Sequence, residues 1–109
     1  LDYPQQKGDM PEKNWGMPVT TLEQTYRLDP AWGQDSLFVR DNLLGVSGTL
    51  WSECINSTER IYYQAFPRAA ALAEAGWSVP ERRSYKEFLK RVRPLTDDMQ
   101  RRGIAVNVR

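Results

Sequence analysis

The chain has 109 residues, the size of one small domain, and 40% of them are hydrophobic, so it can bury only a modest core. Its 15 lysines and arginines nearly balance its 14 aspartates and glutamates, which argues against a nucleic-acid surface, and no apolar run approaches the roughly 20 residues that span a bilayer. With no histidine and Cys54 as its single cysteine, the chain excludes histidine-dependent catalysis, a cysteine-rich metal site and an internal disulfide, and we expect no cofactor.

The first part of the chain is predicted to be mainly loop. It begins with a leucine rather than an initiator methionine, which leads us to expect a processed or truncated piece. Residues 1–3 are typical of a strand end, and the proline- and glycine-rich stretch 4–18 indicates a long irregular loop, a kind that is often functional. Thr20 and Glu23 have the spacing of a capping box, which predicts a short helix through about Leu28.

The middle of the chain is predicted to contain a strand followed by helical segments. The continuous apolar-rich run Leu43–Trp51 predicts a strand that is buried on both faces. Residues 56–59 then provide capping side chains for a long helical segment. Pro67 lies within that segment and either kinks the helix or starts a second one, and Gly76 is expected to end it.

The last part of the chain is predicted to form one amphipathic helix. Ser84 and Glu87 have capping-box spacing, and apolar residues then recur at i, i+3, i+4 and i+7. The apolar positions are Tyr85, Phe88, Leu89, Val92, Leu95 and Met99. Pro94 is expected to kink this helix, and Gly103 is expected to cap its C-terminal end.

The order of the predicted elements is strand, helix, strand, helices. This βαβα order predicts the α/β class with parallel strands. Two strands cannot make an independent parallel sheet that is covered on both faces. We therefore expect the chain to be one part of a larger domain.

A tryptophan and a glutamate lie close together at the end of the predicted strand. Trp51 and Glu53 are two residues apart, so in a strand their side chains share one face. The carboxyl end of a parallel strand is where barrels and open α/β sheets bind ligands. An indole face can stack on a sugar ring, and a carboxylate accepts hydrogen bonds from sugar hydroxyls. The pair indicates a carbohydrate site, although spacing alone leaves open a core tryptophan beside a surface glutamate.

Several short motifs keep their order and spacing along nearly the whole chain. They are Leu1-Asp2-Tyr3, Leu22-Glu23 with Tyr26, Asp29-Pro30, Trp51-Ser52-Glu53, Pro67-Arg68, Ala73-Glu74-Ala75-Gly76-Trp77-Ser78 and Arg102-Gly103-Ile104-Ala105. Together they resemble the closing part of the glycoside hydrolase family 20 β-N-acetylhexosaminidases. The resemblance implies that residues 1–109 are a single partial domain, the C-terminal βαβα piece of a (β/α)₈ TIM barrel. It would comprise strands seven and eight with the following helices, and be helix-rich as an isolated chain. The missing N-terminal part of the barrel would be its partner.

The resemblance also implies a sugar subsite. Trp51 would stack under the terminal non-reducing N-acetylhexosamine, Glu53 would hydrogen-bond its O4 hydroxyl, and Asp2 would contact O4 or O6. The reaction would be substrate-assisted retention, in which the 2-acetamido oxygen attacks the anomeric carbon with the help of an Asp–Glu pair. Nothing in this chain matches that pair, and the adjacent acids Asp97 and Asp98 indicate a solvated helix face. No catalytic residue is therefore assigned to this chain.

Other residues near these motifs have structural interpretations. Arg68 and Glu74 are interpreted as ionic groups that anchor a helix rather than as site residues. The sequence Asn56-Ser57-Thr58 is formally a glycosylation acceptor, and its role as a helix cap explains it better.

Two classes of function remain open. The first is a fragment of a hexosaminidase that acts on glycans containing N-acetylhexosamine, whose parent we expect to be secreted, periplasmic or on the cell surface. The second is a stand-alone helical interaction module without enzymatic activity. We expect neither a nucleic-acid nor a membrane partner. We do expect the isolated chain to self-associate, because its predicted strand has an unpaired edge and an apolar face.

Overall fold

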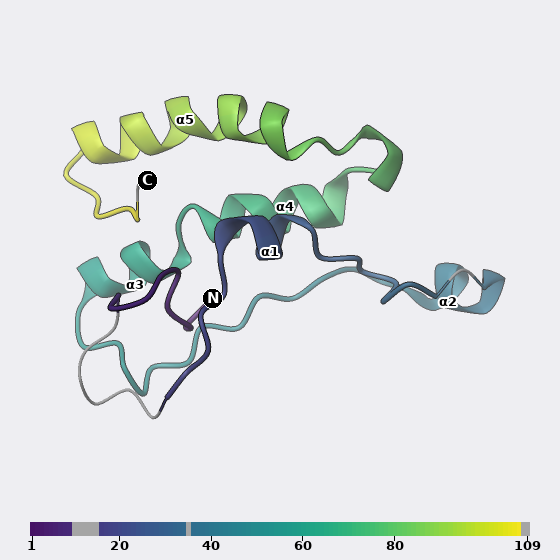
Figure 1. Cartoon of the computed structure of the whole chain (residues 1–109), viewed down its shortest axis with the longest axis horizontal. Helices are drawn as coiled ribbons and strands as arrows, with labels where there is room; N and C mark the ends of the chain where they lie inside the picture. The colour runs from purple at the N-terminus through teal and green to yellow at the C-terminus, as the bar shows by residue number, and fades with distance from the viewer. Residues whose placement is uncertain (10–15, 35, 108–109) are drawn as a thin grey trace.

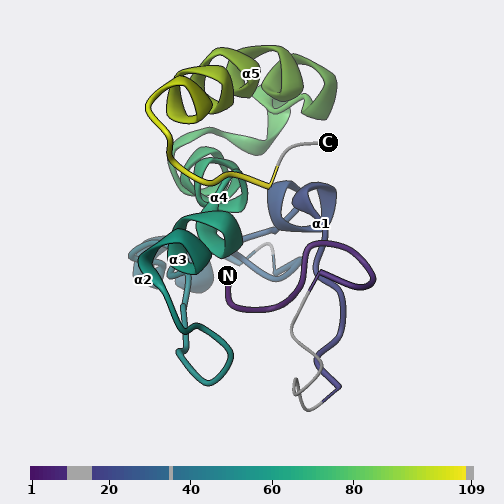
Figure 2. The ribbon, with the colours of Figure 1, turned by 90° about the vertical axis from the view of Figure 1, so that its left-hand side faces the viewer.

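The computed structural model describes residues 1–9, 16–34 and 36–107. Within these ranges the elements are α1 (Leu22–Tyr26), α2 (Leu37–Asn42), α3 (Thr58–Ala65), α4 (Arg68–Trp77), the 3-10 helix η1 (Pro80–Arg82) and α5 (Tyr85–Arg101). The long helix α5 forms a layer over α4, α1 lies beside α4, and α2 projects from one end of the group (Figure 1). Figure 2, turned by 90°, shows α5 again above α1, α3 and α4. No helix in the described ranges combines the length and the apolar content that a membrane crossing needs.

The helix α1 begins one residue later than predicted. Its N-cap is Thr21, whose hydroxyl accepts from the Gln24 N–H at 3.1 Å while the Gln24 side chain accepts from the Thr21 N–H at 2.8 Å. The predicted box of Thr20 with Glu23 is therefore wrong, because Gln24 takes the reciprocal role. Glu23 instead forms an ion pair with Arg27 one turn later, at 2.7 Å.

Pro67 separates two helices rather than kinking one. The hydroxyl of Ser57 accepts from the Arg60 N–H at 3.1 Å and caps the start of α3, as predicted for this segment. Pro67 then stands at the N-cap of α4, because proline has no N–H with which to continue the hydrogen-bond ladder of α3. Gly76 does not end α4, which extends one residue beyond it.

The start and the end of α5 agree with the prediction. The hydroxyl of Ser84 accepts from the Glu87 N–H at 3.4 Å, which is one of the two bonds of a capping box. The helix continues through Pro94, and the kink expected there stays a prediction. It ends in a Schellman motif, in which Gly103 has a φ of 74° and the N–H groups of Gly103 and Ile104 bond back to the last turn at 3.0 and 2.9 Å. The predicted C-terminal cap is thus confirmed.

The hydrophobic core lies between α1, α4 and α5. Its buried members are Tyr26, Ala71, Phe88 and Val92, with Leu22, Ala70 and Tyr85 packed against them. The rings of Tyr26 and Phe88 stack with their centroids 4.8 Å apart. Part of the predicted apolar stripe of α5 faces this core, whereas Leu89 and Leu95 are each 41% exposed.

The segment 43–51 is not the buried strand that its apolar run predicts. The described residues contain no β-strand, and this segment is largely exposed, with Leu44 fully open to solvent. A strand needs a neighbouring strand for its hydrogen bonds. The terminal ammonium of Leu1 donates to the Thr49 carbonyl at 2.7 Å, which joins this segment to the predicted strand end at residues 1–3 without forming a ladder. The strand prediction is therefore wrong for this chain, and the helix-rich prediction is confirmed.

The same segment passes closely over α4. A Cβ atom on Gly48 would lie 2.4 Å from the side chain of Leu72, and one on Gly76 would lie 2.9 Å from the side chain of Val46. Glycine at these two positions lets the backbone approach the neighbouring side chain. Of the predicted loop 4–18, residues 10–15 lie outside the described ranges, and the rest is irregular.

Candidate functional site

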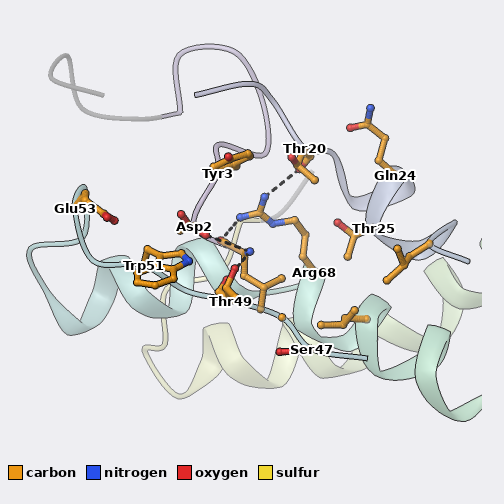
Figure 3. A pocket seen from close by; sticks show the side chains of 14 residues that line it. Asp2, Tyr3, Thr20, Gln24, Thr25, Ser47, Thr49, Trp51, Glu53 and Arg68 are labelled. Atoms are coloured by element: carbon orange, nitrogen blue, oxygen red, sulfur yellow. Dashed lines mark hydrogen bonds and ion pairs between the residues drawn. The ribbon is translucent and has the colours of Figure 1, made fainter. Parts of the chain in front are cut away.

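The three predicted site residues line one hollow of about 670 Å³. Asp2 belongs to the N-terminal segment, whereas Trp51 ends the segment 43–51 and Glu53 lies in the connection that follows it before α3. Figure 3 shows these side chains around the hollow, with Arg68 extending into it from α4. The fold thus brings together two regions that are about 50 residues apart in the sequence.

Trp51 and Glu53 reach the hollow by a turn rather than by strand alternation. Trp51 lies on irregular backbone and is 64% exposed, so it is not a core residue of this chain. Glu53 follows in a turn in which the Ile55 N–H donates to the Ser52 carbonyl at 3.1 Å. An exposed indole and an exposed carboxylate are therefore both available to a ligand on this side.

Asp2 is buried, with 6% of the residue exposed. One of its carboxylate oxygens lies 3.6 Å from the Leu1 ammonium, and its carbonyl accepts a hydrogen bond from the side chain of Gln64 at 2.8 Å. Burial, and then the nearby Arg68 guanidinium, lower the pKa of the Leu1 ammonium below its usual 8.0, while Asp2 opposes this shift.

Arg68 ties this region to α4. It is fully buried, and its guanidinium donates to the carbonyls of Gln64 at 2.7 Å, of Thr20 at 3.1 Å and of Leu1. These bonds agree with the structural role expected for Arg68, although the acceptors are carbonyls. Glu74 forms its ion pair with Arg91 of α5 and so joins two helices.

The adjacent acids of α5 lie outside the hollow. Asp98 forms ion pairs with Arg101 at 3.3 Å and with Arg102 at 2.8 Å, and Asp97 is exposed. These contacts agree with a solvated helix face. The described part of the chain holds no group of three or more acidic or cysteine side chains that could bind a metal ion.

Tyr3 and Thr49 also line the hollow, and sequence reasoning did not assign them to the site. Tyr3 directly follows Asp2, and Thr49 lies two residues before Trp51. This closeness in the sequence is the signal that could have identified them. A second hollow, of about 720 Å³, lies between the loop around α2 and the end of α4 and contains Trp77. It holds none of the predicted site residues.

Comparison with known proteins decides the family. The catalytic domain of glycosyl hydrolase family 20 matches residues 1–80. The chain belongs to this family. This family 20 chain is similar to a β-hexosaminidase of Akkermansia muciniphila, with 40% identity over 93 residues that cover 84% of the chain and 18% of that protein. It is also similar to a chitooligosaccharidolytic β-N-acetylglucosaminidase of Ostrinia furnacalis, with 34% identity over 91 residues that cover 84% of the chain and 15% of that protein.

Solved structures agree with this assignment. The family 20 chain superposes on a crystal structure of a β-N-acetylhexosaminidase with a TM-score of 0.83 and 35% identity, over 99% of the chain and 22% of that structure. It also superposes on a GH20 exo-β-N-acetylglucosaminidase of Vibrio harveyi in complex with N-acetylglucosamine. The TM-score is 0.79 and the identity 28%, over 96% of the chain and 17% of that structure. The chain spans less than a quarter of the length of these relatives. The family resemblance in the sequence motifs is thus confirmed.

Proposed function

We propose that this chain is the C-terminal part of a β-N-acetylhexosaminidase barrel and supplies part of the subsite for a terminal non-reducing N-acetylhexosamine. The observation that carries the proposal is that Asp2, Trp51 and Glu53 line one open hollow. Membership of family 20 supports an N-acetylhexosamine glycan as the ligand. The small share of each relative that the chain covers, and the unpaired segment 43–51, support its being one part of a (β/α)₈ barrel. In that barrel, segment 43–51 would be the eighth strand.

The three side chains divide the work of holding one sugar ring. The indole of Trp51 offers an exposed, flat apolar face on which the C–H groups of the ring can stack. Glu53 is an exposed carboxylate that can accept a charge-assisted hydrogen bond from the O4 hydroxyl. Asp2 is largely buried in the lining of the hollow and would accept from O4 or O6. Stacking would orient the ring, and the two carboxylates would select its hydroxyl pattern.

The reaction of the whole barrel would be substrate-assisted retention. The 2-acetamido oxygen attacks the anomeric carbon, an aspartate orients the acetamido group, and a neighbouring glutamate protonates the leaving oxygen. Among the described residues, the acids that line the hollow are Asp2 and Glu53, which are far apart in the sequence and are assigned to binding. The adjacent acids of α5 lie elsewhere, and Asp98 is held by two arginines. The chain would therefore contribute binding, and the rest of the barrel would contribute the acid/base chemistry.

A chimera tests the proposal. In the β-hexosaminidase of Akkermansia muciniphila, this chain would replace the corresponding segment, and release from a chromogenic N-acetylglucosaminide would be measured. We expect the folded chimera to be active and the isolated 109-residue chain to be inactive. Turnover by the verified pure chain, or a folded chimera without activity, would contradict the proposal.

A charge-removing substitution then tests the subsite. Glu53→Gln keeps the shape of the side chain but removes its charge. It should raise the KM of the chimera by about 10- to 150-fold, because a charge-assisted hydrogen bond becomes a weaker neutral one. The matched control is Glu59→Gln, which makes the same change on an exposed glutamate in the first turn of α3, outside the hollow. Equal KM values for the two variants would refute the sugar contact of Glu53.

A further inference from the structure

We propose that Asn107 is a positioning residue for the sugar subsite, because it holds in place the loop that begins at Asp2. The inference rests on the proposed function of Asp2. Its basis is a partly buried polar network that joins the N-terminal loop (residues 2–9), the end of α3 and the C-terminal segment (residues 104–107). The two ends of this network, Asp2 and Asn107, are more than 100 residues apart in the sequence.

The centre of the network is the carboxylate of Asp9. One of its oxygens accepts from the Gln5 N–H at 3.1 Å and from the side-chain amide of Asn107 at 2.7 Å. The other oxygen accepts from the hydroxyl of Tyr63, whose ring is also covered by the guanidinium of Arg60 at 4.9 Å. Three donors from three parts of the chain thus meet one carboxylate.

The loop and the C-terminal segment bind the same end of α3. The side-chain amide of Gln5 donates to the carbonyls of Tyr63 at 2.9 Å, Gln64 at 3.3 Å and Phe66 at 3.2 Å. The backbone N–H of Asn107 donates to the same Phe66 carbonyl, at 3.2 Å. The C-terminal segment is therefore bonded both to α3 and to the loop that α3 carries.

The network continues to the site itself. The side-chain amide of Gln64 donates to the Asp2 carbonyl at 2.8 Å and to the Tyr3 carbonyl at 3.5 Å. Gln5, Gln64 and Asn107 are only 2%, 0% and 3% exposed. Buried polar groups that lose a partner are costly, so a network of this kind favours one arrangement of the backbone. That arrangement includes the residue whose carboxylate is proposed to hold O4 or O6.

The family match ends at residue 80, whereas Asn107 lies well beyond it. The network gives this later part of the chain a role in the subsite. Asn107 suits the role because a carboxylate only accepts hydrogen bonds and an amide can donate one. Asn107→Asp would place a second carboxylate against Asp9. The double variant Asp9→Asn/Asn107→Asp would restore a donor–acceptor pair between the two positions, but the amide nitrogen at position 9 would no longer accept from the Gln5 N–H.

The chimera described above allows a direct test. KM would be measured with the chromogenic N-acetylglucosaminide and with its 4-deoxy and 6-deoxy analogues. We expect Asn107→Asp to raise KM for the parent sugar at least about fivefold, the effect of weakening one hydrogen bond. With the analogue that lacks the hydroxyl bound by Asp2, Asn107→Asp should no longer raise KM. Asp2→Ala should show the same selectivity, with a higher KM for the parent sugar and no increase for that analogue. KM does not depend on the amount of folded enzyme, so a lower yield cannot imitate this selectivity.

The controls separate positioning from general stability. The double variant should recover part of the KM change, because it restores the bond between positions 9 and 107 but not the acceptor of the Gln5 N–H. Asn42→Asp, on the distant helix α2, should leave KM unchanged. If Asn107→Asp does not fold, Asn107→Ser carries the same expectation. An equal KM increase for all three sugars, or no increase while Asp2→Ala remains selective, would overturn the inference and leave the proposed function intact. If Asp2→Ala shows no selectivity, the proposed contact of Asp2 fails, and the inference fails with it.

Discussion

Replacing Trp51 by alanine should separate a binding role from a packing role. Complete loss of a buried tryptophan side chain costs about 3–5 kcal/mol of unfolding free energy. Trp51 is 64% exposed, so only about a third of that cost applies. We therefore expect Trp51→Ala to lower the free energy of unfolding by about 1–2 kcal/mol.

The expected loss in binding follows from the same exposure. If the side chain has about 200 Å² of surface, 64% exposure leaves about 130 Å² open, and a sugar ring stacked on one face would cover about half of it. At about 25 cal/mol per Å², about 65 Å² corresponds to about 1.6 kcal/mol, or about 15-fold in KM. Trp51→Phe keeps a smaller ring and should fall between wild type and alanine.

The assay combines steady-state kinetics of the chimera on the chromogenic N-acetylglucosaminide with unfolding in urea. The matched control is Trp77→Ala, because Trp77 is 92% exposed and lines the second hollow. It should leave KM unchanged. A fall of more than about 3 kcal/mol in unfolding free energy for Trp51→Ala, with an unchanged KM, would show that the indole packs rather than binds.

Three further predictions concern the 109-residue chain itself. Arg68→Lys should lower its free energy of unfolding by about 1.5–3 kcal/mol, because an ammonium cannot replace a guanidinium that donates to three carbonyls; an unchanged urea midpoint would contradict this. The free energy of unfolding should rise with pH just below 8.0 and fall as the pH is lowered. The reason is that the pKa of the Leu1 ammonium is lowered in the folded chain, so the unfolded chain binds more protons in this pH range. N-terminal acetylation should flatten this profile. The chain should self-associate in sedimentation equilibrium at micromolar concentration, since segment 43–51 is unpaired and Leu44 is fully exposed, whereas a monomer with a sharp thermal transition would favour an interaction module.

Helices whose signals are local could be predicted from the sequence. For α5, the hydroxyl of Ser84, the apolar period and Gly103 all act within a few residues of the positions they affect. The box at α1 was misplaced by one residue because Thr20 and Thr21 both have a suitable partner three positions later. The sequence analysis did not predict α2. Its six residues show no amphipathic pattern, and none of them is buried in the structure.

Motifs spread along the chain also determined the family, since each is a short stretch that can be recognised without its neighbours in space. Contacts between distant residues depended on the tertiary structure. The segment 43–51 has the composition of a buried strand, yet a strand forms only where another one supplies its hydrogen bonds. The end of α1 is held by Arg83, which donates to the Tyr26 carbonyl from 57 residues away.

The candidate site shows the same division. Sequence spacing placed Trp51 and Glu53 near each other, and the family resemblance assigned Asp2 to the same subsite. The tertiary structure shows how the chain brings Asp2 to this hollow and surrounds its loop with a polar network. The bond between Asp9 and Asn107 joins residues 98 positions apart. No local pattern encodes such a bond, because it forms only when α3, the loop and the C-terminal segment have all packed together.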